Sequence, residues 1–307
     1  MKTESSGIFG FVSFDFENLN HEPKTPQGPF EKDSLLLTQC SCDGLILVSV
    51  LVKDPDGSFE AELKCNVRTS LILWNPSIGL YKRISCPHEI TFSSRLGLGY
   101  DSAVDDYRVF VVSRENETSV MVYNSRNDSW NIFIDNRYVL SSWTHPAVLN
   151  GAVHWVMCPY ESVSCVIVYF DLVEEKFKEV PPPSSWKKDD EMRLVVLGEQ
   201  LCVYCDIDVK QIEVYAMKEY GNKESWTRLF VIPCGILKSI HVCNQNCTCT
   251  AVRPLCLTKN GQVLIQVGSW VVGNYDPKDS AFLSFDSERG WMPLPYVETL
   301  ISPGGGV

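Results

Sequence analysis

Grouped carboxylates are the first residues in this 307-residue chain whose types and spacing could do chemistry. Asp101, Asp105 and Asp106 lie close together, and two carboxylates facing one sugar ring are the usual catalytic pair of glycosidases. These three, however, lie in a short polar stretch between two apolar runs. Other acids and amides recur at one position of a repeated pattern: Asn75, Asn124, Asp171 and Asp286. Because catalysis needs one copy at one place, whereas every turn needs its own, we expect these side chains to form turns.

Cysteines supply the densest set of possible metal ligands. The set comprises Cys243, Cys247, Cys249 and Cys256, with His241 beside it. Zinc ligands usually come in pairs separated by two to four residues, whereas Cys247 and Cys249 are separated by one. We therefore expect a metal-free surface insertion with reduced cysteines and no cofactor. A metal-dependent module built on the same insertion remains the alternative.

Motifs of other catalytic sites are incomplete. The sequence has no G-x-S-x-G, and His88-Glu89 lacks the second histidine of a zinc protease helix. Gly97-Leu98-Gly99 begins like a dinucleotide-binding loop but lacks its third glycine. The sequence thus predicts a binding protein and not an enzyme.

Charge and hydropathy narrow the partners and the compartment. The formal net charge is −11 and no cluster of Lys and Arg occurs, so nucleic acid is not expected as a partner. The N-terminus has an acidic Glu4 where a signal peptide carries positive charge. The longest apolar run, 46–52, is far shorter than the ~20 residues that a spanning helix needs. We expect a cytoplasmic or nuclear protein without membrane contact.

The chain repeats one hairpin pattern five times. Each copy has an apolar run, an aromatic residue, a short polar turn and a second aromatic residue. The first aromatics are Trp74, Tyr123, Phe170, Tyr215 and Phe285, and the second are Tyr81, Trp130, Phe177, Trp226 and Trp291. We expect the second aromatics to be buried, because they begin the strand that packs on the next repeat. Segments 172–180 and 215–226 have charges at helical spacing, but the repeat predicts strands there.

A second hairpin lies between these copies. Its five instances are 35–50, 96–112, 146–156, 194–204 and 255–267. Asp43-Gly44, Asn150-Gly151 and Asn260-Gly261 provide the residue pairs that two-residue hairpin turns need. One repeat is therefore two hairpins, or four strands, which is the size of a β-propeller blade.

The spacing of the first aromatics predicts the number of blades. Their gaps are 49, 47, 45 and 70 residues, so the fourth repeat carries an insertion, for which 234–253 is the candidate. The remaining residues suffice for one composite blade, closed by 296–301 pairing with 8–16. We therefore expect an all-β propeller of six four-stranded blades over 35–302. Residues 1–34 would supply a closing strand and a loop, and 303–307 a flexible tail.

The repeat resembles the F-box-associated, kelch-like domain of plant F-box proteins. The matching pieces follow in order: Ser41-Cys-Asp-Gly44, Leu73-Trp-Asn-Pro76, Leu98-Gly-Tyr-Asp-Ser102, Asp105-Asp-Tyr-Arg-Val109, Asn150-Gly-Ala-Val-His-Trp155, Phe170-Asp-Leu172, Met217-Lys-Glu-Tyr-Gly221, Ser225-Trp-Thr227 and Tyr296-Val-Glu-Thr-Leu300. This resemblance implies the substrate-recognition part of a ubiquitin-ligase receptor. Family members open with a helical F-box that binds a Skp-type adaptor, and nothing before Leu35 has a helical period. We expect adaptor binding only where an F-box precedes these repeats.

Segments that interrupt the repeat are the expected contact regions for a substrate protein. They are 51–67, 234–253 and 269–278, and the last carries Trp270 and Tyr275 as candidate partner-binding residues. A propeller that binds carbohydrate or acts on glycans is the alternative function.

Overall fold

The computed structural model describes most of the repeat region of the chain. The described residues are 24–26, 28–30, 35–51, 69–88, 90, 94–114, 118–140, 145–162, 164–186, 192–205, 211–233, 235, 252–268, 271–285 and 293–304. The elements described in full are β-strands apart from one 3₁₀ turn, η1 (Lys223–Ser225). None of the described helices is long and apolar enough to cross a membrane.

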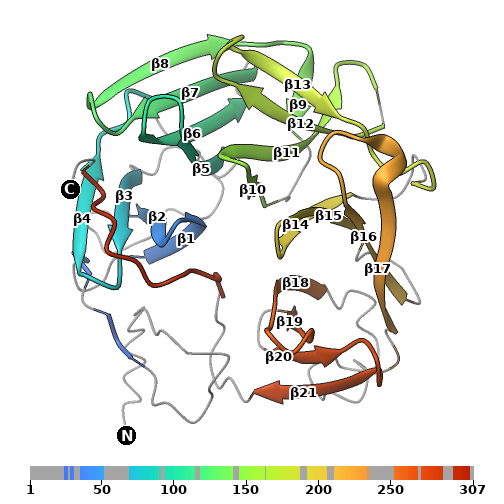
Figure 1. The fold of residues 1–307 in the computed structure, drawn as a ribbon. Coiled ribbons are helices and arrows are strands. Elements are labelled where there is room, and N and C mark those ends of the chain that lie inside the picture. Colours follow the sequence, from blue (N-terminus) through green and yellow to red (C-terminus); the bar gives the residue numbers. More distant parts are fainter. Residues whose placement is uncertain are drawn as a thin grey trace, which may run out of the picture. The chain divides into compact units, whose positions relative to one another are not determined.

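Five antiparallel sheets contain all of these strands (Figure 1), and each sheet is one blade. The first two sheets are β1 (Leu35–Cys42), β2 (Leu45–Leu51), β3 (Thr69–Asn75) and β4 (Leu80–Ile84), followed by β5 (Arg95–Asp101), β6 (Asp106–Arg114), β7 (Thr118–Asn124) and β8 (Ser129–Ile134). The third is β10 (Ala147–Leu149), β11 (Ala152–Pro159), β12 (Val166–Asp171) and β13 (Lys176–Val180), with β9 (Tyr138–Leu140) also paired to β11.

The last two sheets are β14 (Arg193–Leu197), β15 (Gln200–Tyr204), β16 (Gln211–Met217) and β17 (Trp226–Pro233), then β18 (Val252–Leu257), β19 (Val263–Val267), β20 (Val271–Asp276) and β21 (Ala281–Phe285). The predicted all-β propeller class is confirmed. The described residues form five blades and not six, so the predicted number is corrected.

Sequence pattern explains the position of each strand in its sheet. The second and third strands are near-continuous apolar runs, and every residue from Leu45 to Val50 in β2 is buried. Such runs are typical of strands covered on both faces. The fourth strands are more exposed: β4 has one buried position, Ile84, and β8 has only intermediate and exposed positions, as expected for outer strands with one open face. The five inner hairpins predicted from the sequence are all present.

Two of the three predicted two-residue turns form, whereas Asn260-Gly261 lies in the longer connection 258–262. Asp43 and Gly44 have φ of 49° and 84°, and Asn150 and Gly151 have 53° and 74°. Both central residues of a type I′ turn need positive φ, which Asn, Asp and Gly tolerate best. Segments 172–180 and 215–226 form turns and strands, with only η1 helical, so the repeat overrides the helical charge spacing.

The fifth outer hairpin differs from the prediction. Its strands are β20 and β21, and Tyr275 faces Phe282 across the pair. Tyr275 is therefore the first aromatic of this repeat, in place of Phe285, and the spacing of seven residues to Phe282 matches the first three repeats. Segment 271–276 is consequently a strand and not a loop. The predicted partner of Phe285, Trp291, lies outside the described residues.

Two compact units hold these sheets, and each has its own core. One comprises residues 1–113, 120–132 and 296–307, and the other 114–119 and 133–295. In the first, buried side chains of the β1–β4 sheet, such as Leu47 and Leu73, pack with Val109 and Met121. In the second, one cluster joins the β10–β13 and β14–β17 sheets, and another joins β14–β17 to β18–β21. The hydrophobic core thus lies between adjacent blades.

The second aromatics of the repeats are not uniformly buried. Phe177 is 1% exposed, whereas Tyr81 is 49% exposed, so the expectation of burial is confirmed for the first and wrong for the second. Tyr81 lies near the start of the outer strand β4. Its side chain packs beside Arg83, whose guanidinium carbon is 5.9 Å from the centre of the tyrosine ring. Trp130 and Trp226 are intermediate in exposure.

Both of these tryptophans bond to the preceding blade. Trp130 Nε1 donates to the Ser85 carbonyl at 2.8 Å, and Trp226 Nε1 donates to the Pro181 carbonyl at 2.8 Å. Ser85 and Pro181 each follow the last strand of the blade before. The same interblade hydrogen bond therefore recurs in the two units.

Removing one indole donor tests this interblade hydrogen bond. We expect Trp226→Phe to lower the free energy of unfolding by about 1–2 kcal/mol, because a hydrogen bond is lost and the partly buried Pro181 carbonyl loses its donor. Trp130→Phe should cost less, because its bond is more exposed to water. Urea titrations give the free energy of unfolding of both variants, provided that the m-value is unchanged. A larger loss of stability for Trp130→Phe than for Trp226→Phe would contradict the assignment of the stronger interblade hydrogen bond to Trp226.

Candidate functional site

Turn carboxylates bond to the backbone of their own turns. Asp171 Oδ1 accepts from the Val173 and Glu174 amides at 2.9 Å each, and its Oδ2 lies 2.7 Å from Lys178 Nζ. The hydrogen bond from Lys178 is the main cause that holds the pKa of Asp171 below its usual value. Asp276 accepts from the Lys278 amide in the same way. The prediction that the recurrent acids form turns is confirmed for Asp171, whereas Asp276 takes the position predicted for Asp286, which lies outside the described residues.

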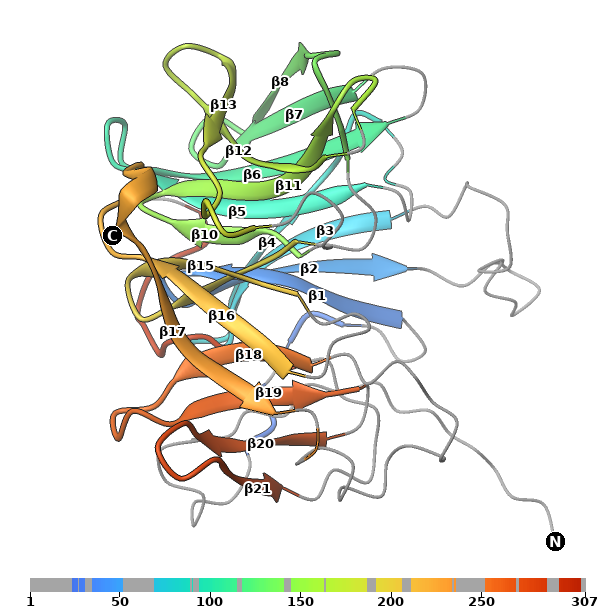
Figure 2. The same ribbon diagram turned by 90° about the vertical axis from the view of Figure 1, so that its right-hand side faces the viewer.

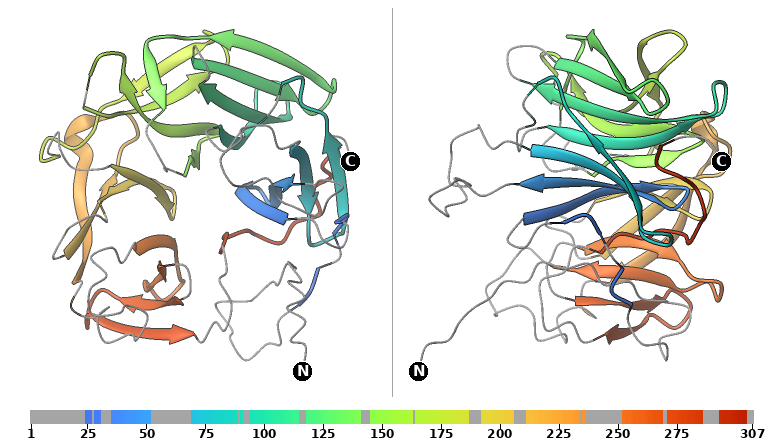
Figure 3. Two further views of the ribbon diagram at one scale, coloured as in Figure 1. Left: turned by 180° about the vertical axis from the view of Figure 1, so that it is seen from behind. Right: turned by 90° about the vertical axis from the view of Figure 1, so that its left-hand side faces the viewer.

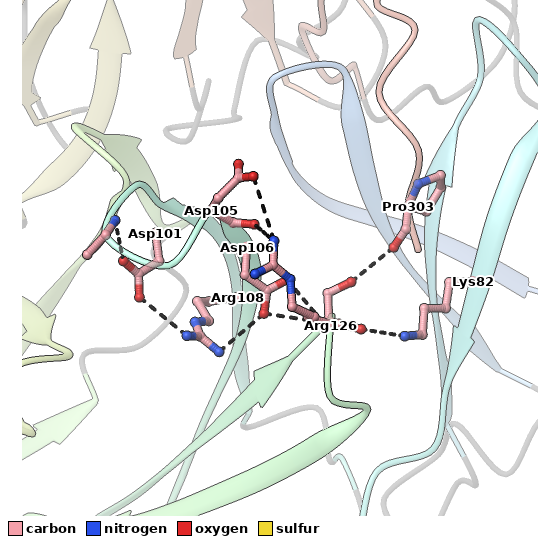
Figure 4. Close-up of polar contacts among 9 residues, drawn as sticks. Lys82, Asp101, Asp105, Asp106, Arg108, Arg126 and Pro303 are labelled. Atoms are coloured by element: carbon pink, nitrogen blue, oxygen red, sulfur yellow. Dashed lines mark hydrogen bonds and ion pairs between the residues drawn. The ribbon is translucent and has the colours of Figure 1, made fainter. Parts of the chain in front are cut away.

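The acidic group Asp101, Asp105 and Asp106 surrounds two arginines at the β5–β6 turn (Figure 4). Arg108 lies between two carboxylates, with its terminal nitrogens 3.4 Å from Asp101 Oδ2 and 3.3 Å from Asp106 Oδ2. Asp106, only 4% exposed, also accepts from the Arg126 amide at 3.0 Å. With one guanidinium between them and the Arg126 amide bonded to Asp106, these carboxylates are placed to hold two turns together.

The β7–β8 turn extends this network to other strands. Arg126 donates to the Asp105 carbonyl at 3.0 Å, and Lys82 Nζ donates to the Ser125 carbonyl at 2.6 Å. Ser125 Oγ in turn donates to the Pro303 carbonyl at 3.0 Å. These contacts link β4, β7 and the C-terminal segment at one end of their sheets (Figure 4).

Residues 296–303, which we call the strap, run along the β1–β4 sheet (Figure 3). Asn75 Nδ2 donates to the Thr299 carbonyl at 3.1 Å and to the Ile301 carbonyl at 2.8 Å, while Asn75 itself is fully buried. Thr299 Oγ1 donates to the Asp43 carbonyl at 3.0 Å. A Cβ on Gly44 would lie 2.4 Å from Thr299 Oγ1, so only glycine fits beneath the strap.

The strap corrects one prediction about the C-terminus. Residues 296–301 are not in a strand; they bond to turn residues instead, because Asn75 offers both amide hydrogens to their carbonyls. The predicted partner strand, 8–16, lies outside the described residues. Pro303 is buried and accepts a hydrogen bond, so ordered packing continues into the segment expected to be a flexible tail.

A buried histidine joins two blades of the other unit. His154 in β11 is fully buried, with Nδ1 3.2 Å from the Ala147 carbonyl and Nε2 2.6 Å from the Tyr220 hydroxyl. Nδ1 can only donate to that carbonyl, so Nε2 accepts from Tyr220. Burial lowers the pKa of His154 to about 4, which keeps the ring neutral. Sequence reasoning missed this contact, although both residues lie in motifs that carried the family resemblance.

The predicted partner-binding residues have different outcomes. Trp270 lies outside the described residues. Tyr275 is fully buried in β20 and its hydroxyl donates to the Val231 carbonyl at 2.6 Å, so this side chain has no surface for a partner. Tyr275 packs the β18–β21 sheet against β17, and its selection as a contact residue is corrected for that reason.

The cysteine insertion is only partly described. Cys243, Cys247 and Cys249 lie outside the described residues, whereas Cys256 lies in β18 and is not in a disulfide. In the part of the chain that the structure describes, no group of three His, Cys, Asp or Glu side chains could hold a metal ion. The described cysteines include one disulfide, Cys158–Cys165, which lies outside this insertion.

The two ends of each sheet differ in their connections. Within a blade, the first and third connections lie at one end, here called the turn end, and range from 43–44 to 218–225. The second connection lies at the opposite end, the loop end, and ranges from 268–270 to 52–68. Figure 2 shows strands of each sheet running side by side between these ends. Trp270 belongs to a loop-end connection.

The family model and the curated relatives that match this chain point to the same family. The family model described as "F-box associated beta propeller domain" matches residues 12–266. Among curated proteins of Arabidopsis thaliana, "F-box protein At3g07870" is 30% identical over 195 residues, covering 58% of this chain and 47% of that protein. "F-box/kelch-repeat protein At3g23880" is 29% identical, covering 53% of this chain and 48% of that protein. This chain therefore spans about half the length of the curated relatives it matches.

Solved structures resemble this chain more distantly. "Crystal structure of AofleA from Arthrobotrys oligospora" has a TM-score of 0.45 at 10% identity, covering 79% of this chain and 68% of that one. "Crystal structure of Nidogen/Laminin Complex" has a TM-score of 0.44 at 11% identity, covering 86% and 80%.

Proposed function

This chain belongs to the F-box-associated β-propeller family, and we propose from this premise that it recognises a substrate protein for a Skp–cullin–F-box ubiquitin ligase. Its relatives are named as F-box proteins. We propose that the blades bind the substrate in the cytoplasm or nucleus, and that a Skp-type adaptor binds only through an F-box joined to them.

The observation that carries this proposal is the contrast between the two ends of the blades. Turn-end residues are bonded to one another: Arg108 is shared by two carboxylates and Asn75 holds the strap. These contacts within the turn end give it rigidity and occupy polar groups that a partner would otherwise use. Loop-end connections differ in length from blade to blade, which is typical of recognition surfaces on a conserved scaffold. We therefore place substrate recognition at the loop end.

The geometry gives less support to a glycan-acting enzyme. That function needs two carboxylates that face a common substrate, about 5–9 Å apart. Among the described acids, Asp101 and Asp106 share one arginine, and Asp171 bonds its own turn. Each of these candidates is already engaged in holding a turn.

Site-specific photo-crosslinking tests the recognition end. A photoreactive amino acid is placed at Trp270, in a loop-end connection, and in a second protein at Val173, a turn-end residue that is 89% exposed. In plant extract, we expect one protein to crosslink at position 270 and not at 173. Equal crosslinking at both positions, or capture only at 173, would overturn the choice of end.

The crosslinked protein, once purified, allows a binding measurement. We expect Trp270→Ala to weaken its binding at least about tenfold, as for an aromatic interface anchor, with stability within about 0.5 kcal/mol of the parent. Val173→Ala is the matched control and should leave binding unchanged. Unchanged binding of Trp270→Ala would remove Trp270 from the recognition surface.

A further inference from the structure

Two cysteines face each other across one hairpin of the third blade. Cys158 is in β11 and Cys165 directly precedes β12. The register pairs Met157 with Val166, so the next pair is Cys158 and Cys165. Their Cα atoms are 4.1 Å apart, close to the ~4.5 Å of a non-hydrogen-bonded pair, and the two residues form a disulfide.

This pair differs in its access to solvent from Cys40 and Cys202. Cys40 and Cys202 are buried, and burial raises the pKa of each thiol to about 12. Only a thiolate takes part in exchange, so those two cysteines are inert near neutral pH. Cys158 and Cys165 are partly exposed at a sheet end, where a small thiol can reach them.

The disulfide closes a turn at the loop end of its blade. Tyr160 lies in this turn, with 65% of its surface exposed, and its amide donates to the Arg137 carbonyl at 2.8 Å. On the other side of β11, Cys158 pairs with Val139 of β9. The bond therefore fixes Tyr160 between β12 and the segment that contains β9.

We propose that Cys158 and Cys165 are a reversible redox pair that exchanges with glutathione and controls how firmly the Tyr160 turn is held. One protein thiolate attacks glutathione disulfide, breaking its S–S bond and releasing one glutathione thiolate. The second protein thiolate then attacks the mixed disulfide at the protein sulfur and releases the second. The protein dithiol is oxidised, glutathione disulfide is reduced, and the two protons end on two glutathione thiols.

The consequence for recognition rests on the proposed function, because the turn lies at the end assigned to substrate binding. The disulfide closes a short loop and removes conformations that the reduced chain can adopt, so local opening of the turn becomes rarer. The oxidised protein thus presents Tyr160 in a fixed position, and the reduced protein presents it in a looser turn.

Differential alkylation of the purified chain tests the redox pair without any partner. After equilibration with glutathione disulfide, native iodoacetamide labelling and mass spectrometry should find Cys158 and Cys165 unlabelled and joined in one peptide pair. After equilibration with excess reduced glutathione, both should be labelled, while Cys40 and Cys202 stay unlabelled under both conditions. Labelling of both cysteines in glutathione disulfide, or a disulfide that persists in reduced glutathione, would overturn the proposal.

Chymotrypsin provides the readout for the turn. Cleavage after Tyr160 should be about tenfold faster, or more, in the reduced protein than in the oxidised protein. The double variant Cys158→Ser/Cys165→Ser should be cut at the fast rate under both conditions, and Cys86→Ser, at a partly exposed free thiol, should behave as the parent. Equal rates for the two redox states would refute control of the turn. Because neither readout uses a substrate, failure here and failure of the crosslinking experiment are separate results.

Discussion

Phe177→Ala is expected to lower the free energy of unfolding by about 3–5 kcal/mol, a large fraction of the ~5–15 kcal/mol that holds a domain folded. The ring is 1% exposed and contacts three others edge to face. Its centroid lies 5.5 Å from Phe170, 5.8 Å from Tyr138 and 6.1 Å from Trp155. Truncation would remove these contacts and leave a cavity that β-sheet backbone on both sides cannot fill.

Tyr81→Ala is the matched control, because Tyr81 occupies the same position of the repeat in the first blade. Its ring is 49% exposed, so truncation should cost less than about 1 kcal/mol. Urea unfolding of the two variants beside the parent measures the difference. If both variants lose the same free energy of unfolding, then the difference in burial between Phe177 and Tyr81 does not determine their contributions to stability.

The sequence predicted most of the blade architecture because its signals are local. Apolar runs define the inner strands, and residue pairs such as Asp43-Gly44 define the turns between them. Asp171 bonds its own turn over two or three residues, so its role could be inferred from its position in the repeat. The same local reasoning predicted that these carboxylates form turns and are not a catalytic pair.

The fifth repeat shows where local signals are ambiguous. Tyr275-Asp276 and Phe285-Asp286 are both an aromatic residue followed by an acid, and either could end the third strand of a blade. Pairing of Tyr275 with Phe282 decides between them, and the resulting burial of Tyr275 removes it from the surface. Choosing the later dipeptide displaced the hairpin by about ten residues and turned a core residue into a predicted contact.

Contacts between distant segments could not be predicted. His154 and Tyr220 are 66 residues apart, and Asn75 and Ile301 are 226 apart. No periodicity relates such residues, although His154, Tyr220 and Asn75 each lie in a piece that carried the family resemblance. The strap took the place of a predicted strand because the buried Asn75 amide needs acceptors, and the extended C-terminal carbonyls supply them.

Stability is expected to fall by about 3 kcal/mol between pH 6.5 and pH 4 because of His154 alone. In the unfolded chain a histidine takes up a proton near pH 6.5, whereas burial lowers the pKa of folded His154 to about 4. Between these values the unfolded state binds the extra proton, so acid favours unfolding by up to about 1.4 kcal/mol per pH unit. The stability from neutral His154 is thus complete above pH 6.5 and is lost as the pH falls toward 4.

Two variants separate the titration of His154 from its hydrogen bond. Tyr220→Phe leaves buried Nε2 without a donor and should cost about 1–2 kcal/mol at pH 7 while keeping a steep loss with acid. His154→Gln cannot titrate, so its free energy of unfolding should change by about 3 kcal/mol less than that of the parent over the same window, whatever its value at pH 7. Urea midpoints at half-unit pH steps provide both curves. Parallel curves for the parent and His154→Gln would show that some other group, and not this buried imidazole, sets the acid sensitivity of the fold.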